Sequence, residues 1–486
     1  MERSLVLPNE EEKQNIASIL LKAARADDKS FTQEYTIHVV SPMIWGDEGS
    51  RESIIDDAPF RSTSIRGQLR FWWRATRGAA YDNTAELRKQ ETILFGDPDF
   101  PSPLKVVVKE LEKRLLGGEE KKNYEYSRFS DLPRYVTFPF QESMREAVYG
   151  TFKLMITVPS DMKETYEQEI CPAIWAWINF GGIGARTRRG CGSLYCQQFS
   201  PNENENIHAW YQHKASSYKL ELPSIQTESK HEWPVLCSQL LCNPHKDSFN
   251  DAWKRVITVY KNFRRLPNPK PKKETANKKP RRSFWPEADF IRKYTDMAEP
   301  DHKNSQTLDQ VAEVQPAFPR AQFGLPIQFQ FKCNRSKRHL DEKHREPYKS
   351  ELIPADNKNR LASPLILKAL AVGSTAKSKW EGRGQAIIAV LKQPKLKQLS
   401  LRLVHDGHSS HKRHWKNIQR KLERLSITEE HIYPDYQYLE KYSHRNPLQH
   451  GYSTKQLGAT EKSSTTSAIE AFLSSKEVIH WWSNRS

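Results

Sequence analysis

One segment of the chain, CPAIWAWINFGGIGARTRRGCGSLYCQQF, limits the possible folds more than any other. Residues 171–180 are almost entirely apolar and carry Pro172 in a first-turn position, which predicts a buried helix. This helix should end at Gly181-Gly182, because glycine is common after the last helical turn. Residues 192–199 then have the pattern of a strand. The sequence therefore predicts a buried helix, a glycine-rich loop and a closing strand in direct succession.

Signals earlier in the chain give the order of the preceding elements. Residues 35–43 have the β-branched content of a buried strand, and residues 132–141 and 150–159 indicate two further strands that are neighbours. An arginine-rich helix follows the first strand, and we expect an insertion near residues 82–130. The resulting order is β-α-β-β-α-β, the ferredoxin-like arrangement, which RRM domains also use as a platform for single-stranded RNA.

The later part of the chain contains a strongly basic segment, RRLPNPKPKKETANKKPRR, at residues 264–282. It has nine basic residues, one acid and four prolines, so we expect a flexible cationic insertion that contacts phosphate or only aids solubility. Residues 200–245 look polar and irregular, and residues 248–263 have a helical pattern. Strand patterns return at 323–332, 363–372 and 384–391.

These patterns predict an α+β protein with two ferredoxin-like domains. Residues 1–200 form the first domain, which contains the arginine helix and the glycine loop. Residues 201–320 form a helical and basic insertion. Residues 321–486 form the second domain, which ends in a helical tail.

The charge balance favours a polyanionic partner. Lys and Arg outnumber Asp and Glu by 76 to 59, which gives a net charge of +17, and this indicates nucleic acid first and an anionic membrane surface second. No stretch approaches the roughly 20 apolar residues of a membrane span. The acidic N-terminus, where we expect a short amphipathic helix, lacks the apolar region of a signal peptide. We therefore expect a cytoplasmic protein without membrane contact.

The cysteines and histidines do not predict a metal centre. None of the six cysteines forms a C-x-x-C pair, which is typical of a reduced compartment. Cys237, Cys242 and His245 are loosely spaced, and no second ligand pair follows at zinc-finger distance. The histidines of residues 405–414 lie in a polar, basic segment that favours a solvated or RNA-facing loop. We expect no metal and no cofactor.

The arginine helix, STSIRGQLRFWWRATRGAA at residues 62–80, carries a column of positive charge. Its spacing places four arginines within an arc of roughly 80° on one helix face, namely Arg66, Arg70, Arg74 and Arg77. Like charges one turn apart repel, and a polyanion would relieve that repulsion. The alternative is a solvated face. Trp72 is expected in the core, whereas Trp73, at the border of the arginine face, is a candidate for stacking on a base.

The glycine loop carries five glycines in the twelve residues 181–192, together with three arginines. Glycine lets backbone N–H groups approach a phosphate, and arginine holds phosphate through charge-assisted hydrogen bonds. A dinucleotide-binding G-x-G-x-x-G follows a strand and opens a helix, but here a helix comes first. A P-loop needs Gly-Lys-Ser/Thr, which is missing. The loop therefore suits a chain of phosphates better than a bound nucleotide.

These motifs resemble the RAMP superfamily of CRISPR proteins. Five stretches look like one family within it, the first-numbered subunit of Cmr-type (subtype III-B) antiviral defence complexes: SIRGQLRFWWRATRG, FGGIGARTRRGCGSL, SFWPEADFIR, AQFGLPIQFQF and RLASPLILKAL. The resemblance implies two ferredoxin-like domains, a prokaryotic host and neighbouring RAMP subunits. It also implies a role in holding the 3′ region of the guide RNA and in binding target RNA without cutting either.

Two alternatives remain open at the level of sequence. The first is a RAMP endoribonuclease that processes CRISPR repeat RNA, for which His38 and the acid pairs Asp47-Glu48 and Asp56-Asp57 are the only candidates. The second is an adaptor that contacts only other subunits through its tryptophans. The RNA-facing helix contains no histidine to serve as a general base, so we predict a protein that is not an enzyme.

The predicted RNA-binding residues come from two segments. The arginine helix supplies Arg66, Arg70, Trp73, Arg74 and Arg77, and the loop supplies Gly182, Gly184, Arg186, Arg188, Arg189 and Gly190. The prediction requires that the guanidinium groups of residues 66–77 share one trough with the backbone amides near 182–190.

Overall fold

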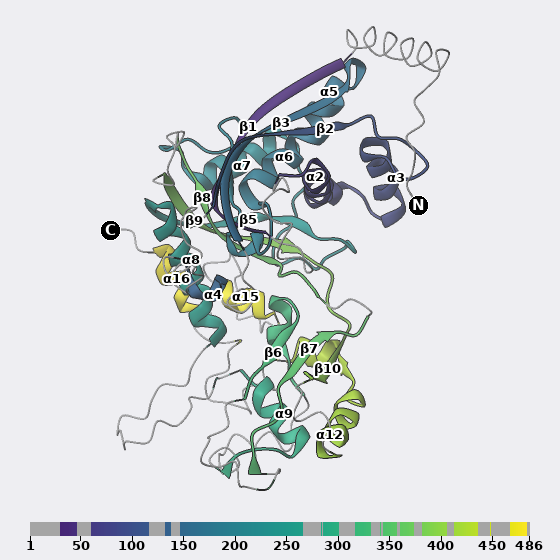
Figure 1. Cartoon of the computed structure of the whole chain (residues 1–486), viewed down its shortest axis with the longest axis vertical. Helices are drawn as coiled ribbons and strands as arrows, with labels where there is room; N and C mark the ends of the chain where they lie inside the picture. The colour runs from purple at the N-terminus through teal and green to yellow at the C-terminus, as the bar shows by residue number, and fades with distance from the viewer. Residues whose placement is uncertain are drawn as a thin grey trace, which may run out of the picture.

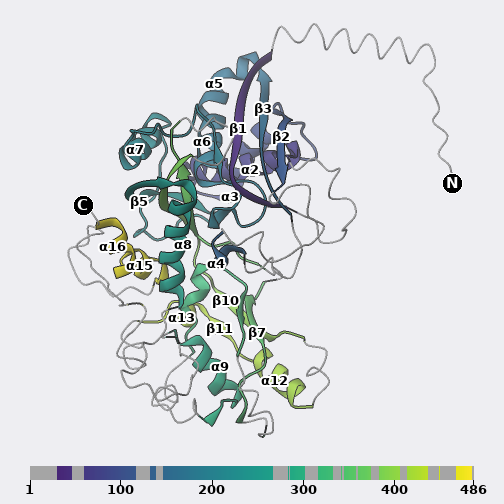
Figure 2. The same cartoon turned by 60° about the vertical axis from the view of Figure 1, so that its left-hand side comes forward.

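The computed structural model contains three antiparallel sheets, which follow one another along the long axis of the molecule (Figures 1 and 2). The structure describes residues 30–45, 60–115, 132–137, 146–265, 283, 285–300, 316–331, 341, 344–356, 360–373, 382–405, 413–435, 448 and 467–483. The N-terminal helix expected before residue 30 and the basic segment from 266 to 282 lie outside these residues. The acid pairs at 47–48 and 56–57 lie outside them too.

The first sheet has the strand order β2-β3-β1-β4. Its strands are β1 (Ser30–Trp45), β2 (Lys105–Leu115), β3 (Glu146–Pro159) and β4 (Leu194–Tyr195). Helices α2 (Ser62–Thr76) and α6 (Cys171–Phe180) pack against each other and cover one face of this sheet. The β-α-β-β-α-β order expected for this part of the chain is present.

Side chains alternate between the two faces along each strand, and this pattern shows which face of the sheet the helices cover. Ile37 of β1 pairs with Phe152 of β3, and both side chains are fully buried toward the helices. The neighbours Thr36 and Lys153 point the other way and are more exposed. In α6, every residue from Pro172 to Phe180 is buried, so the helix lies in the core as its composition predicted.

Two local predictions were wrong. The predicted strand at 132–141 begins as a short helix, α4 (Arg134–Thr137). The partner of β3 is instead β2, within the predicted insertion. The sequence of β2, KVVVKELEKRL, is rich in charge because the strand lies at the sheet edge. The same insertion contains helix α3 (Thr84–Phe95).

The second sheet has the order β5-β9-β8. Its strands are β5 (Val235–Ser248), β8 (Leu365–Ala371) and β9 (Arg383–Lys392). Helix α8 (Phe249–Arg265) packs on all three strands and carries seven buried side chains. β5 and α7 (Ile207–Ser217) lie where the sequence looked mostly irregular. Because β5 pairs with β9, this sheet draws on residues from both sides of the boundary expected at residue 320.

The third sheet has the order β11-β10-β7-β6 and lies at the lower end of the molecule (Figure 1). Its strands are β6 (Ile327–Phe329), β7 (Ser350–Pro354), β10 (Gln398–Leu403) and β11 (Ile427–Thr428). Helices α9 (Glu287–Thr295) and α12 (Arg413–Glu423) contact each other, and α12 packs on β10.

The remaining short elements connect these layers. They are η2 (Arg77–Ala80), η5 (Ser160–Met162), α5 (Lys163–Thr165), η6 (Tyr166–Ile170), η7 (Thr187–Arg189), η9 (Pro319–Phe323), α13 (Glu429–Ile432), α15 (Ala468–Leu473) and α16 (Lys476–Ser483). Helix α16 packs on α8 and β5, so the end of the chain covers the second sheet. The whole is an α+β protein with several antiparallel sheets.

Candidate nucleic-acid interface

The arginines of α2 face α3 and the segment that follows it. Arg66 Nη1 donates to the Leu104 carbonyl at 2.9 Å, and Arg70 Nη2 donates to the Gly96 carbonyl at 3.0 Å. Burial lowers the pKa of Arg66, and the charge of Arg70 lowers it further. These guanidinium groups therefore fix the turn after α3 as well as presenting charge.

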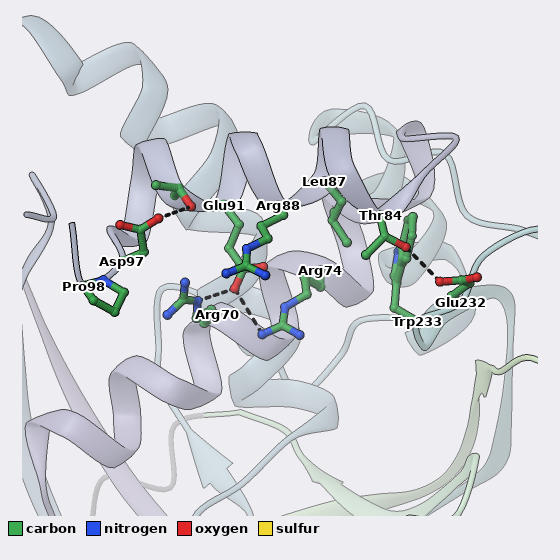
Figure 3. Close-up of a pocket in the computed structure, with 11 residues that line it drawn as sticks. Arg70, Arg74, Thr84, Leu87, Arg88, Glu91, Asp97, Pro98, Glu232 and Trp233 are labelled. Atoms are coloured by element: carbon green, nitrogen blue, oxygen red, sulfur yellow. Dashed lines mark hydrogen bonds and ion pairs between the residues drawn. The ribbon is translucent and has the colours of Figure 1, made fainter. Parts of the chain in front are cut away.

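A buried carboxylate neutralises the middle of the arginine face. Glu91 of α3 is 7% exposed and forms ion pairs with Arg70 and, at 3.1 Å, with Arg74 (Figure 3). The two arginines remain partly exposed and line a pocket of about 580 Å³ with the exposed Arg88. Arg74 Nε is buried and has no hydrogen-bond partner among the described residues. The lining also includes Asp97 and Glu232, so three carboxylates accompany the three arginines around this pocket.

Trp73 does not lie at an open border of this face. Its side chain is fully buried, and its indole N–H donates to Glu169 at 2.8 Å. Glu169 also pairs with Arg77 at 2.8 Å, so one carboxylate holds the last turn of α2 in place. The ring packs against Tyr81 and Phe95. Trp73 is thus a core residue in this structure, and its ring is not available for stacking on a base.

The glycine loop lies on a different side of α2. It closes on itself and on β1, through hydrogen bonds from Ile183 N to Gly192 O (2.9 Å) and from Gly192 N to Pro42 O (3.0 Å). A Cβ at Gly192, where φ is +58°, would lie 1.8 Å from the Ile183 carbonyl oxygen. Gly182 and Gly190 are likewise buried, whereas Gly184 is exposed. Most of the loop glycines therefore allow close contact within the protein.

A row of backbone amides in the loop has no hydrogen-bond acceptor in the described part of the chain. Arg186 has the left-handed conformation (φ 59°, ψ 32°) and precedes η7. Within the described residues, the N–H groups of Arg186, Thr187 and Arg188 donate no hydrogen bond. Successive amides at a change from left-handed to right-handed backbone form a concavity that binds anions.

The three loop arginines have different environments. Arg189 is buried and donates to the Leu365 carbonyl (2.8 Å) and to the Ser363 hydroxyl (2.9 Å), so it anchors the loop to β8. Arg188 donates to the Ser363 carbonyl, and burial lowers its pKa to about 10, with a further contribution from Arg189. Arg186 Nε has no hydrogen-bond partner among the described residues.

A cationic cluster forms where the loop meets α8, and we call it the loop cluster. It consists of Arg186, Arg189 and Arg264 with Tyr135 and Tyr260. Arg189 and Arg264 donate to the Tyr260 hydroxyl at 3.2 and 3.1 Å, and Arg189 lies 4.7 Å from the ring centroid. Within the described part of the chain, none of these arginines forms an ion pair with a carboxylate.

The electrostatics of Tyr260 agree with an excess of positive charge. Burial acts to raise the pKa of this phenol, but the guanidinium groups of Arg264 and Arg189 outweigh it and bring the pKa below its ordinary value. A position that favours the anionic form of a buried tyrosine also favours a bound anion. The loop cluster is therefore chemically suited to phosphate.

The two predicted segments do not form one trough in this structure. The α2 arginines contact α3, Glu169 and nearby backbone carbonyls, none of which belongs to the loop. One contact joins the two surfaces, because the Arg188 guanidinium lies 5.5 Å from the centroid of the Phe71 ring of α2.

Two residues near the loop were missed by the sequence analysis. Arg264 belongs to the loop cluster. The sequence analysis assigned it to the flexible basic segment, whereas in the structure it belongs to the last turn of α8. Lys368 of β8 is 1% exposed and donates to the Gly181 carbonyl at 3.0 Å, at the C-terminus of α6. The sequence signal for this residue was a single lysine within an otherwise apolar strand, SPLILKALAV, which indicates a buried cation.

The described residues offer few candidates for metal binding or acid–base catalysis. The described residues contain no group of three or more His, Cys, Asp or Glu side chains able to hold a metal ion, and His408 and His411 lie outside them. His38 is half-buried on β1, 3.1 Å from the Thr151 hydroxyl, and burial lowers its pKa. None of the helices described is both long and apolar enough to span a bilayer.

An antiparallel sheet backed by two helices, with a basic glycine loop after the second helix, defines the class of the N-terminal unit. Residues 36–195 match the family model described as the RAMP superfamily. Over these residues the chain is similar to the RAMP superfamily, and it resembles Cmr1 of type III-B CRISPR complexes.

Two curated relatives come from Pyrococcus furiosus. The CRISPR system Cmr subunit Cmr1-1 is 32% identical over 155 residues, which cover 30% of this chain and 43% of the relative. Subunit Cmr1-2 is 27% identical over 161 residues, which cover 28% of this chain and 83% of the relative. The match thus spans less than half of the first relative.

Two solved structures are similar at low identity. The crystal structure of Cmr1 from Pyrococcus furiosus in its apo form has a TM-score of 0.40 and 16% identity, and covers 81% of this chain and 96% of that one. The cryo-EM structure of the type III-B Cmr-beta complex bound to cognate target RNA has a TM-score of 0.39 and 13% identity, with coverages of 81% and 99%.

Proposed function

We propose that this chain is a non-catalytic RNA-binding subunit of a type III-B CRISPR effector complex. It holds the 3′ region of the guide RNA, helps to capture target RNA and contacts other RAMP subunits in the cytoplasm of a prokaryotic cell. The match to the RAMP superfamily and the similarity to two Cmr subunits support this proposal. We further propose that β5, α8, β8 and β9 form the second ferredoxin-like unit.

The observation that carries the proposal is the loop cluster with its free amides. Three guanidinium groups lie together without a carboxylate among the described residues, beside three N–H groups that donate to nothing in the described chain. Phosphate oxygens accept from both kinds of donor and supply the missing negative charge. Such contacts position a strand without reading its bases, which suits a system in which the guide supplies the sequence.

Within this proposal, the residues of the loop have separate roles. Arg186, Arg188 and the free backbone amides of residues 186–188 contact phosphate, whereas Arg189 holds the loop in place. The prediction that α2 contributes phosphate ligands stays a prediction. Arg70 and Arg74 would have to share their charge between Glu91 and the RNA.

The test is RNA binding by the full chain, measured by fluorescence anisotropy with an unstructured single-stranded RNA over a range of salt concentrations. Replacing Arg186 and Arg188 by Gln should weaken binding by about tenfold or more at 0.1 M salt, equally for different sequences. Loss of two phosphate contacts should also flatten the log–log salt slope by about 1.4.

Two controls define the outcome. The double Lys variant of Arg186 and Arg188 keeps both charges and should keep the salt slope of RNA binding. It therefore distinguishes an effect of lost charge from an effect of a distorted loop. Arg70→Gln tests the α2 face in the same assay. An unchanged affinity and slope in the double Gln variant would contradict the proposed function.

A further inference from the structure

Helix α12 carries a row of basic side chains on its outer face. The spacing of three and four residues places Arg413, Lys416 and Arg420 on one side of the helix, over about 10 Å at 1.5 Å per residue. All three are exposed, and Arg424 follows them directly. We call these four residues the α12 basic face.

The opposite side of α12 is buried against the third sheet and α9. Ile418 and Leu422 are 6% and 1% exposed, in the core that α12 shares with β10 and α9. The helix therefore does not expose the apolar strip with which an amphipathic helix enters a lipid surface. Its outward side is polar and cationic, and this excludes an apolar docking face as well.

The charge of this face is not compensated within the described chain. None of its four side chains forms an ion pair or a hydrogen bond there. The one acid of the helix, Glu423, accepts from Gln419 at 2.7 Å instead. Repulsion between cations one turn apart weakens an isolated helix, so this arrangement is stabilised when a polyanion binds.

The face lies apart from the loop cluster in the molecule. In both views α12 lies at the outer edge of the lower end, whereas α4 and α8, which contribute Tyr135 and Arg264 to the loop cluster, lie nearer the middle (Figures 1 and 2). A single-stranded RNA held at the loop cluster therefore does not cover α12 with the same few nucleotides.

We infer that the α12 basic face is a second RNA-binding surface, which contacts the phosphate backbone of a single strand. The choice of RNA as the polyanion rests on the proposed function; the surface itself rests on the exposure, spacing and lack of partners of its side chains. Backbone contact by flexible cations predicts strong salt dependence and no preference for sequence.

The experiment replaces Arg413, Lys416 and Arg420 by Gln in the full chain and measures anisotropy with a 30-nucleotide polyuridine RNA. Loss of three phosphate contacts should weaken binding by about tenfold or more at 0.1 M salt and flatten the salt slope by about 2. A Lys variant of Arg413 and Arg420 keeps the charge and should bind like the parent protein.

A matched control removes the same number of charges elsewhere. Lys105, Lys109 and Lys113 are exposed on the edge strand β2, and their triple Gln variant should retain the parent slope. Full affinity in the α12 variant, with weakened binding in the Arg186/Arg188 variant, would overturn this inference alone. Full affinity in both variants would overturn the proposed function as well.

Discussion

At the scale of single residues, Lys368 links strand β8 of the second sheet to the end of helix α6. Its ammonium group is buried in an apolar strand and caps the C-terminus of α6 through the Gly181 carbonyl. A cation at a helix C-terminus is favourable, but burial dominates and lowers the pKa of Lys368 from 10.5 to about 7. Below pH 7 the protein must therefore bury a full charge.

This shift predicts how stability depends on pH. Between about pH 7 and 10.5 the unfolded chain holds a proton on Lys368 that the folded chain has lost, so the free energy of unfolding should rise with pH by up to about 1.4 kcal/mol per pH unit. Urea unfolding of the parent protein and of Lys368→Met from pH 6 to 9 measures this. The stability of the parent relative to the Met variant should increase with pH, and a constant difference would contradict the assignment.

At the scale of elements, the glycine loop depends on geometry that only glycine permits. Gly192→Ala places a Cβ against the Ile183 carbonyl at a positive φ, and should destabilise the fold by at least about 2 kcal/mol. Gly67→Ala is the matched control, because Gly67 lies inside α2 with no atom within 4 Å of the added Cβ. It should stabilise by about 0.5–1 kcal/mol. Thermal unfolding of both variants checks this, and equal effects would contradict it.

Some of the helices and strands could be predicted from the sequence, and others could not. Helices α2, α6 and α8 and strands β1, β8 and β9 follow from apolar periodicity, because their buried faces are long and regular. Strand β2 was missed because an edge strand carries charge. The burial of Trp73 was missed because helical spacing places a residue on a helix face but does not show which other segment covers that face. Here Glu169 and Phe95 cover it.

The site was predictable to a similar extent. Spacing identified the arginines of α2 and the loop, but it carried no information on Glu91, which is distant in sequence and neutralises part of the column. Glu91→Gln tests this pairing. Losing a carboxylate shared by two partly exposed arginines should destabilise the protein by roughly 1–3 kcal/mol, measured by urea unfolding. No loss of stability would show that the arginines have other partners.

At the scale of the whole molecule, the net charge of +17 is distributed over regions with different roles. The α2 arginines are largely compensated by carboxylates and carbonyls, while the loop cluster and the α12 basic face have no carboxylate partner in the described chain. We therefore expect RNA to bind the loop cluster and the α12 basic face. The arginines of α2 mainly join α2, α3 and the turn after α3.

The most direct measurement is photo-crosslinking of 4-thiouridine-containing guide RNA to the full chain, within the effector complex assembled with its other subunits, followed by peptide mapping. We expect adducts in residues 182–190, and their yield should fall when Arg186 and Arg188 are replaced by Gln. Adducts confined to other surfaces, such as α7 or the open face of the first sheet, with none in 182–190, would contradict it.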